Sequence, residues 1–118
     1  AEQTACALPV RLAWDALKNG SADGNDIATI ADVIAICIVA AEGMDDLVQE
    51  TCEAARVALA EISDRFTRVK RWGVDARSLR DIPPIVDFYE ELLRNATGGQ
   101  MEEWLGAVRD LKNAMATQ

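Results

Sequence analysis

The sequence predicts an all-α fold, an antiparallel bundle of four to five helices with one long central helix, in a single domain over residues 1–118. The first supporting observation is the stretch Met44–Trp72, which lacks proline and glycine and carries apolar residues three and four positions apart. The second is the stretch Asp26–Ala41, in which only three residues are polar. The third is that glycines and prolines fall mostly between the apolar stretches, where helices end and begin.

The first helix is predicted over Leu8–Asn19, after a short lead-in at residues 1–7. Pro9 suits a first helical turn because its missing N–H would have no acceptor there. Gly20 follows as a C-terminal stop. The apolar stripe of this helix consists of Val10, Ala13, Trp14 and Leu17.

The second helix is predicted over Asp26–Ala41, with Asp23 or Asn25 as its N-terminal cap. Its apolar residues surround nearly the whole cylinder. A helix of this kind is buried on most sides or lies in an oligomer interface. Only Glu42-Gly43 separates it from the next helix, so the two are expected to form an antiparallel hairpin.

The long third helix is predicted to run to about Trp72, with Gly73 as a left-handed cap. Its acids come early and its bases come late, which agrees with the helix dipole. Its apolar stripe consists of Leu47, Val48, Thr51, Cys52, Ala55, Ala58, Leu59, Ile62, Phe66 and Val69.

The remaining chain predicts one turn at Ala76–Arg80, capped by Asp75, and two further helices. Pro83 and Pro84 forbid a continuous helix but can open a new one, which is expected to end at Ala96. Thr97-Gly98-Gly99 ends that helix, and the last one is predicted over Gln100–Ala116.

The net charge of −8 argues against nucleic acid and anionic membranes as partners unless the charge is segregated. The segment 42–53 has five acids and no base, and the segment 65–80 has six bases against one acid, Asp75. Two solvated faces are the simpler interpretation of this pattern.

The chain is expected to be soluble and cytoplasmic. Its N-terminus lacks a basic region followed by a long apolar core, and its longest apolar run, Val33–Ala41, is shorter than the roughly 20 residues that span a bilayer. The three cysteines, Cys6, Cys37 and Cys52, have no close pairing and fit buried or reduced thiols.

The sequence predicts no enzyme, no catalytic residue, no metal site and no cofactor. There is no histidine, which removes the commonest general base and metal ligand, and no phosphate-binding glycine loop. A magnesium-dependent all-α hydrolase would need paired E-x-x-E motifs on facing helices, and only Glu50-x-x-Glu53 has that form.

The candidate interaction residues are the bases around the end of the long helix and the tryptophan among them. Base and aromatic together are typical of a surface that contacts phosphates, and tryptophan is enriched at protein interfaces. Trp72 is the tryptophan most expected to be an exposed anchor, since Trp14 and Trp104 lie on apolar stripes. The candidates are Arg65, Arg68, Lys70, Arg71, Trp72, Arg77 and Arg80.

Several short segments resemble small helical proteins of unassigned function from prophages and other mobile elements of proteobacteria. The similarity lies in R-W-G-x-D at Arg71–Asp75, in D-I-P-P at Asp81–Pro84 and in the E-L-L that follows. The segment L-A-W-D-A-L at Leu12–Leu17 adds to it. The resemblance implies an accessory protein of a phage or plasmid and carries no catalytic or binding residues.

Three functions follow as hypotheses. The first is a non-enzymatic protein–protein interaction module, dimeric or bound to a host protein such as a defence complex. The second is a nucleic-acid-binding protein that uses the basic stretch 65–80. The third, least favoured, is a magnesium-dependent nucleotide hydrolase that uses Glu50 and Glu53.

Overall fold

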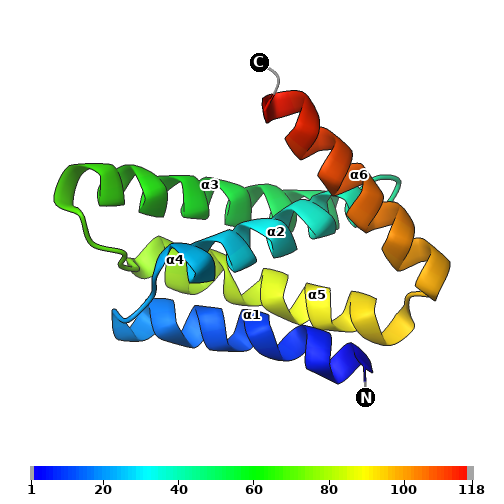
Figure 1. Ribbon diagram of the computed structural model, residues 1–118, viewed down its shortest axis with the longest axis horizontal. Helices are drawn as coiled ribbons and strands as arrows, with labels where there is room; N and C mark the ends of the chain where they lie inside the picture. The colour runs from blue at the N-terminus through cyan, green and yellow to red at the C-terminus, as the bar shows by residue number, and fades with distance from the viewer. Residues whose placement is uncertain (1, 117–118) are drawn as a thin grey trace.

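A computed structural model describes the backbone of residues 2–116 and the side chains of residues 9–110, 113 and 114. Within these residues the chain forms six helices and no strand, which confirms the all-α bundle (Figure 1). Five helices are long, and α4 is a single short turn. The helices are α1 (Glu2–Asn19), α2 (Gly24–Ala41), α3 (Asp46–Val69), α4 (Ala76–Asp81), α5 (Pro83–Asn95) and α6 (Gly98–Ala116).

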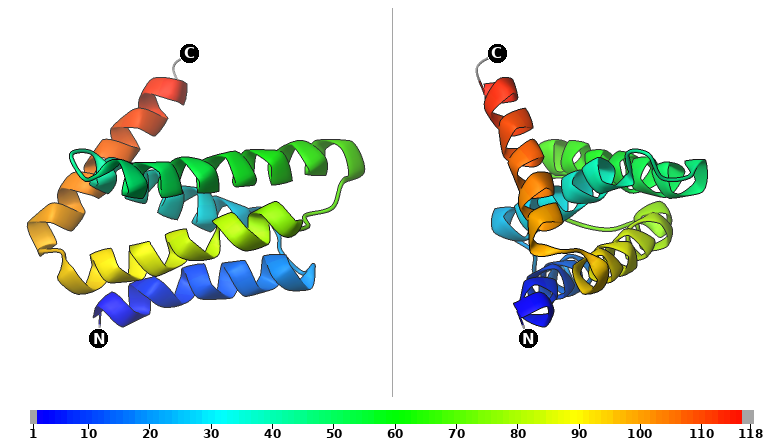
Figure 2. Two further views of the ribbon diagram at one scale, coloured as in Figure 1. Left: turned by 180° about the vertical axis from the view of Figure 1, so that it is seen from behind. Right: turned by 90° about the vertical axis from the view of Figure 1, so that its right-hand side faces the viewer.

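The helices α1, α2, α3 and α5 form the body of the bundle, and each runs opposite in direction to the one before it (Figures 1 and 2). The longest helix, α3, packs against α2, α4 and α5. The helix α2 lies in the middle and packs against α1, α3, α5 and α6. The last helix, α6, crosses the others steeply and projects beyond the body of the bundle (Figure 2).

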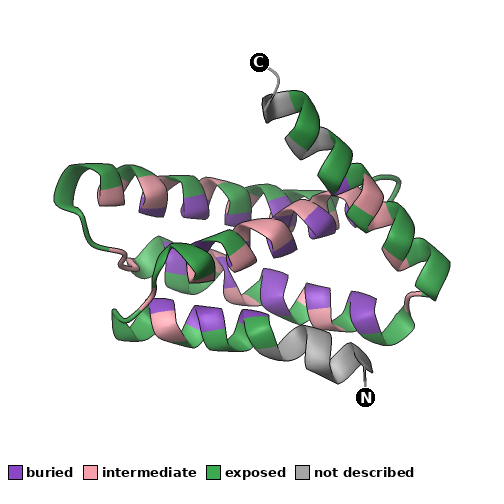
Figure 3. Cartoon of the chain, in the orientation of Figure 1, coloured by how far each residue is buried: buried purple, intermediate pink, exposed green. Residues whose placement is uncertain are grey.

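The position of α2 gives a physical reason for its apolar sequence. Eight of its eighteen residues are buried, and four other helices cover it. Among the described helices, α2 is also the one that is long and apolar enough to cross a membrane. Buried faces of the surrounding helices turn toward it (Figure 3). The interior of one chain therefore accounts for a pattern that the sequence alone also allowed in an oligomer interface.

Side-chain caps set most of the helix starts. The Asp23 carboxylate accepts from the Asp26 backbone N–H, and the Asp26 side chain accepts from the Asp23 N–H, both at 3.0 Å. This reciprocal capping box confirms Asp23 as the start of α2. The Asp45 carboxylate caps α3 by accepting from the Val48 N–H.

Three predicted helix starts were wrong. The helix α2 begins at Gly24 and not at Asp26. The helix α1 begins at Glu2 and not at Leu8, so Pro9 lies inside it, where it removes one backbone hydrogen bond. The helix α6 begins at Gly98 and not at Gln100. There Thr97 Oγ1 accepts from the Gln100 N–H at 3.1 Å and the Gln100 side chain accepts from the Thr97 N–H at 2.9 Å, a capping box that tolerates two glycines in the first turn.

The end of α3 also differs from the prediction. The left-handed residue is Lys70, at φ 59° and ψ 32°, and not Gly73, whose φ is not positive. The Lys70 N–H donates to the Phe66 carbonyl at 2.7 Å. Two residues later the Trp72 ring stacks on Phe66, with centroids 3.8 Å apart and planes 8° from parallel. This stack requires the chain to turn back directly after Val69.

The predicted stripe of α3 is buried in its middle and exposed at its ends. Cys52, Ala55 and Ile62 are at most 2 % exposed, whereas Leu47 is 71 % and Val69 is 56 % exposed. Neighbouring helices cover these two side chains only in part, so the apolar periodicity of the sequence continues further than the core does.

Candidate functional site

The structure divides the basic stretch 65–80 into paired and unpaired cations. Arg65 Nη1 lies 3.0 Å from the Asp75 carboxylate, and Arg77 Nη1 lies 2.7 Å from that of Glu61. Arg80 Nε lies 3.0 Å from the Asp81 carboxylate, which Arg77 Nε also approaches at 3.6 Å. The acids of segment 42–53 take no part in these pairs.

Two of these pairs, those of Arg65 and Arg77 with Asp75 and Glu61, link α3 to α4 and its cap, and the pairs change the pKa values of two acids. Hydrogen bonds from the Ser78 backbone and from the Arg65 guanidinium lower the pKa of Asp75 to about 2. The Arg80 guanidinium, helped by Arg77, lowers the pKa of Asp81. Both carboxylates therefore stay ionised near neutral pH. Arg65 and Arg77 thus link α3 to the α4 segment as well as contributing charge, whereas Arg80 pairs only with its neighbour Asp81.

Three cations at the end of α3 have no ion pair within the described part of the chain. Arg68, Lys70 and Arg71 are all exposed, and the exposed Val69 lies among them in sequence. We call Arg68, Val69, Lys70 and Arg71 the cationic corner. It lies at the end of the bundle where the chain leaves α3 toward α4, on the left of Figure 1.

Trp72 is not the exposed anchor that the sequence suggested. Its ring is partly buried, stacks on Phe66 and packs against the core. Trp14 is 4 % exposed and lies in the core, as predicted, and Trp104 is partly buried against it. Trp72 therefore lies against the surface of the bundle and does not project from it as an exposed contact residue.

A hollow of about 380 Å³ opens beside the cationic corner, between the ends of α1 and α3. Its charged lining residues are Lys18, Arg65 and Arg71, and no acid lines it. The remaining lining residues are small or apolar: Leu17, Gly20, Val69, Trp72, Gly73 and Val74. We call this space the corner hollow.

The cations of the corner hollow are incompletely neutralised. Arg65 Nη2 is buried and has no hydrogen-bond partner. Its pair with Asp75 uses one carboxylate oxygen, while the other accepts from the Ser78 N–H and hydroxyl at 2.9 and 3.0 Å. Lys18 lies 3.3 Å from Asp15 in an exposed pair, a kind that contributes little to stability. Sequence reasoning missed Lys18, because only the fold brings α1 beside the end of α3.

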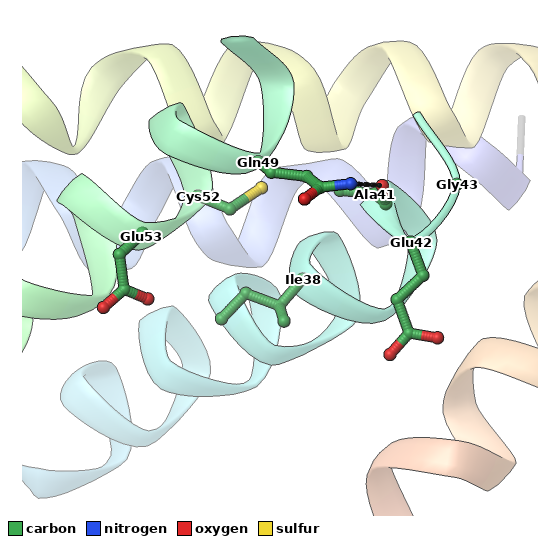
Figure 4. A pocket seen from close by; sticks show the side chains of 7 residues that line it. All are labelled: Ile38, Ala41, Glu42, Gly43, Gln49, Cys52 and Glu53. Carbon is green, nitrogen blue, oxygen red and sulfur yellow. Dashed lines mark hydrogen bonds between the residues drawn. The ribbon is translucent and has the colours of Figure 1, made fainter. Parts of the chain in front are cut away.

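A second hollow, of about 470 Å³, lies between α2 and α3 at the opposite end of α3 (Figure 4). Glu42 and Glu53 stand on either side of Ile38 at its rim (Figure 4). The Gln49 amide donates to the carbonyls of Ala41 at 3.3 Å and Met44 at 3.1 Å, so it closes the turn between the helices. This hollow has an apolar floor and acidic edges and contains no cation.

The described residues contain no group of three or more histidine, cysteine or acidic side chains that could hold a metal ion. Glu50 and Glu53 line different hollows, and Glu53 is paired with Arg56 at 2.5 Å. Cys37 and Cys52 are buried free thiols, and desolvation raises the pKa of each. The side chain of Cys6 lies outside the described residues.

The two ends of α3 carry opposite charge. Four exposed acids lie near its start, and the cationic corner lies at its end. A helix of 24 residues is about 36 Å long, which exceeds the screening length of about 8 Å at physiological salt. The two ends therefore act as separate surfaces. The acids are Glu42, Asp45, Asp46 and Glu50.

Comparisons with models of protein families, with curated proteins and with solved structures find no match for this chain.

Proposed function

We propose that the protein is a non-catalytic helical interaction module that binds a protein partner through the cationic corner. The supporting observation is that Arg68, Lys70 and Arg71 remain without ion pairs in the described part of a chain whose net charge is −8. A protein with excess acid could have neutralised these cations internally, as it does at Arg77.

The composition of the corner fits a protein partner with an acidic surface. Arginine is enriched at protein interfaces, and the exposed Val69 adds an apolar contact between charged side chains. A positive patch steers a negative partner into its bound orientation and suppresses wrong partners by repulsion. The protein would act in the cytoplasm, without a membrane. If it comes from a mobile element, the partner would be a host protein such as a defence complex.

A capture experiment tests the proposal. The tagged full chain is compared with Arg68→Glu/Lys70→Glu and with a control, Arg94→Glu/Arg109→Glu, which reverses two exposed cations on α5 and α6. We expect specific partner proteins, identified by mass spectrometry, to bind the wild type and the control but to be depleted at least tenfold with the corner variant. Equal capture by all three proteins would refute the cationic corner as the binding surface.

A homodimer is a second form of the same proposal. The exposed apolar residues Leu12, Leu47, Leu79 and Leu105 lie on four different helices. Light scattering over a range of concentrations distinguishes the two forms, since a strict monomer removes the dimer and leaves binding to another protein.

Nucleic-acid binding remains the alternative, supported by the same three unpaired cations. Neutralising three phosphates predicts that the logarithm of the binding constant falls with the logarithm of salt with a slope of about −2.7. A titration with duplex and single-stranded DNA at about 50 mM salt, where phosphate contacts are strong, decides it. Absence of binding there would eliminate this alternative.

A further inference from the structure

We infer that the corner hollow binds a carboxylate carried by the partner protein, an acidic side chain with an apolar neighbour. This inference rests on the proposed function and names the chemistry that the partner presents. The hollow is separate from the exposed corner cations Arg68 and Lys70, which do not line it. The inference therefore predicts that residues lining the hollow affect binding of the partner more than the other exposed cations of the cationic corner do.

The charges around the hollow favour an anion. Three cationic side chains reach it from two different helices and the loop after α3, namely Lys18, Arg65 and Arg71. The ends of α1 and α3 also face this region, and each helix C-terminus carries the equivalent of about half a negative charge. Asp15 and Asp75 pair with Lys18 and Arg65, whereas Arg71 has no ion pair in the described structure. An excess of positive charge remains at this end of the bundle because the exposed Arg68 and Lys70 stand beside Arg71 in the chain and are also without ion pairs among the described residues.

The hydrogen-bonding state of Arg65 supports the same ligand. A guanidinium presents five N–H donors, and Asp75 accepts from one of its nitrogens, Nη1. Nη2 is buried without an acceptor, an arrangement that is rare in folded proteins and requires an explanation. An oxyanion drawn into the hollow supplies that acceptor once the lining side chains move apart to admit it.

The walls of the hollow decide between kinds of anion. Leu17, Val69 and Trp72 give it apolar sides, and one face of the Trp72 ring is already covered by Phe66. A space of about 380 Å³ is near the lower end of the size of ligand pockets. It therefore accommodates one charged side chain and a neighbouring aliphatic group. A nucleic-acid strand, with a charge at every nucleotide, fits a continuous basic groove better than this short hollow.

The test uses the ¹⁵N-labelled full chain and a blocked peptide of alternating leucine and glutamate as the probe. The indole N–H of Trp72 reports on the hollow, while that of Trp104, which lines a different hollow, serves as the internal reference. We expect the peptide to shift the Trp72 signal and leave the Trp104 signal in place. A matched peptide with glutamine in place of glutamate is expected to bind at least fivefold more weakly.

Two charge-matched variants complete the test. Arg71→Gln removes a cation that lines the hollow, and Arg68→Gln removes an equally unpaired cation of the cationic corner that does not line it. We expect Arg71→Gln to weaken binding of the acidic peptide at least fivefold and Arg68→Gln to change it less than twofold. Equal binding of both peptides, shifts outside the hollow, or equal affinity in both variants would overturn the inference.

Inorganic phosphate and a ten-nucleotide thymidine strand provide the remaining arms. If either one displaces the acidic peptide and has a lower dissociation constant than the peptide, the hollow is a phosphate site and the carboxylate assignment is wrong. A failure here can be told apart from a failure of the proposed function. Capture of a partner that depends on Arg68 and Lys70 would persist if only the hollow were misassigned.

Discussion

The turn that ends α3 tests how this fold closes. Lys70 occupies the left-handed region, at φ 59°, while Gly73 three residues later does not. A side chain in this region costs about 1–2 kcal/mol because its Cβ crowds the backbone. Glycine is the residue usually found at a left-handed helix cap. Replacing Lys70 with glycine should therefore stabilise the protein.

The size of the effect follows from two opposing terms. Glycine relieves the backbone strain, but it raises the conformational entropy of the unfolded chain, which costs about 0.5–1 kcal/mol. The net gain of Lys70→Gly over Lys70→Ala is about 0.5–1 kcal/mol, since both variants lose the same charge. For a chain of 118 residues, with an unfolding entropy of about 2.1 cal/mol/K per residue, this raises Tm by roughly 2–4 °C.

Gly73→Ala is the matched comparison. A Cβ at Gly73 would meet no atom within 4 Å, and its φ is one that alanine adopts without strain. We expect this variant to be unchanged or stabilised by up to about 1 kcal/mol. Urea unfolding followed by circular dichroism measures all three variants. If Lys70→Gly is no more stable than Lys70→Ala while Gly73→Ala loses about 1 kcal/mol or more, then Gly73 is the cap and our account of this turn is wrong.

Three further predictions concern stability and thiol reactivity. The pKa of Asp75 is about 2 in the folded protein against 3.8 for the free group, so its contribution to stability is present above about pH 4 and is lost as the pH falls toward 2. Between about pH 6 and about pH 2.5 the urea midpoint should therefore fall more for the wild type than for Asp75→Asn. Equal falls in the two proteins would contradict this. Ile62→Ala, at a fully buried position, should cost about 2–5 kcal/mol, whereas Leu47→Ala, at a site 71 % exposed, should change the free energy of unfolding by less than about 0.5 kcal/mol. In a Cys6→Ser variant the two buried thiols should react with a disulfide reagent only after denaturation, and rapid labelling of the native protein would show that the contact between α2 and α3 opens readily.

Local chemistry made several capping residues and the start of α5 predictable. Asp23 and Asp75 cap their helices through residues three positions further on, and such contacts depend only on neighbours in sequence. Pro83 opens α5 for the same local reason. The start of α1 was less predictable, because proline suits both a first turn and, at some cost, a helix interior.

The candidate site was predictable in composition but not in arrangement. The basic stretch was visible in the sequence, yet its division into paired and unpaired cations depends on which acids the fold brings near. Glu61 reaches Arg77 only because α4 folds back along α3. Lys18 joins the corner hollow only because α1 ends beside α3.

Residue spacing and caps a few positions apart were enough to predict the all-α class, the approximate extent of the helices and the buried middle of the apolar stripe on α3. The tertiary structure decided that α2 lies at the centre, because apolar periodicity does not reveal how many neighbours a helix has. Long-range packing also places the left-handed cap of α3 at Lys70, where the chain turns so that Trp72 stacks on Phe66. The unpaired cations at that turn result from the same long-range packing.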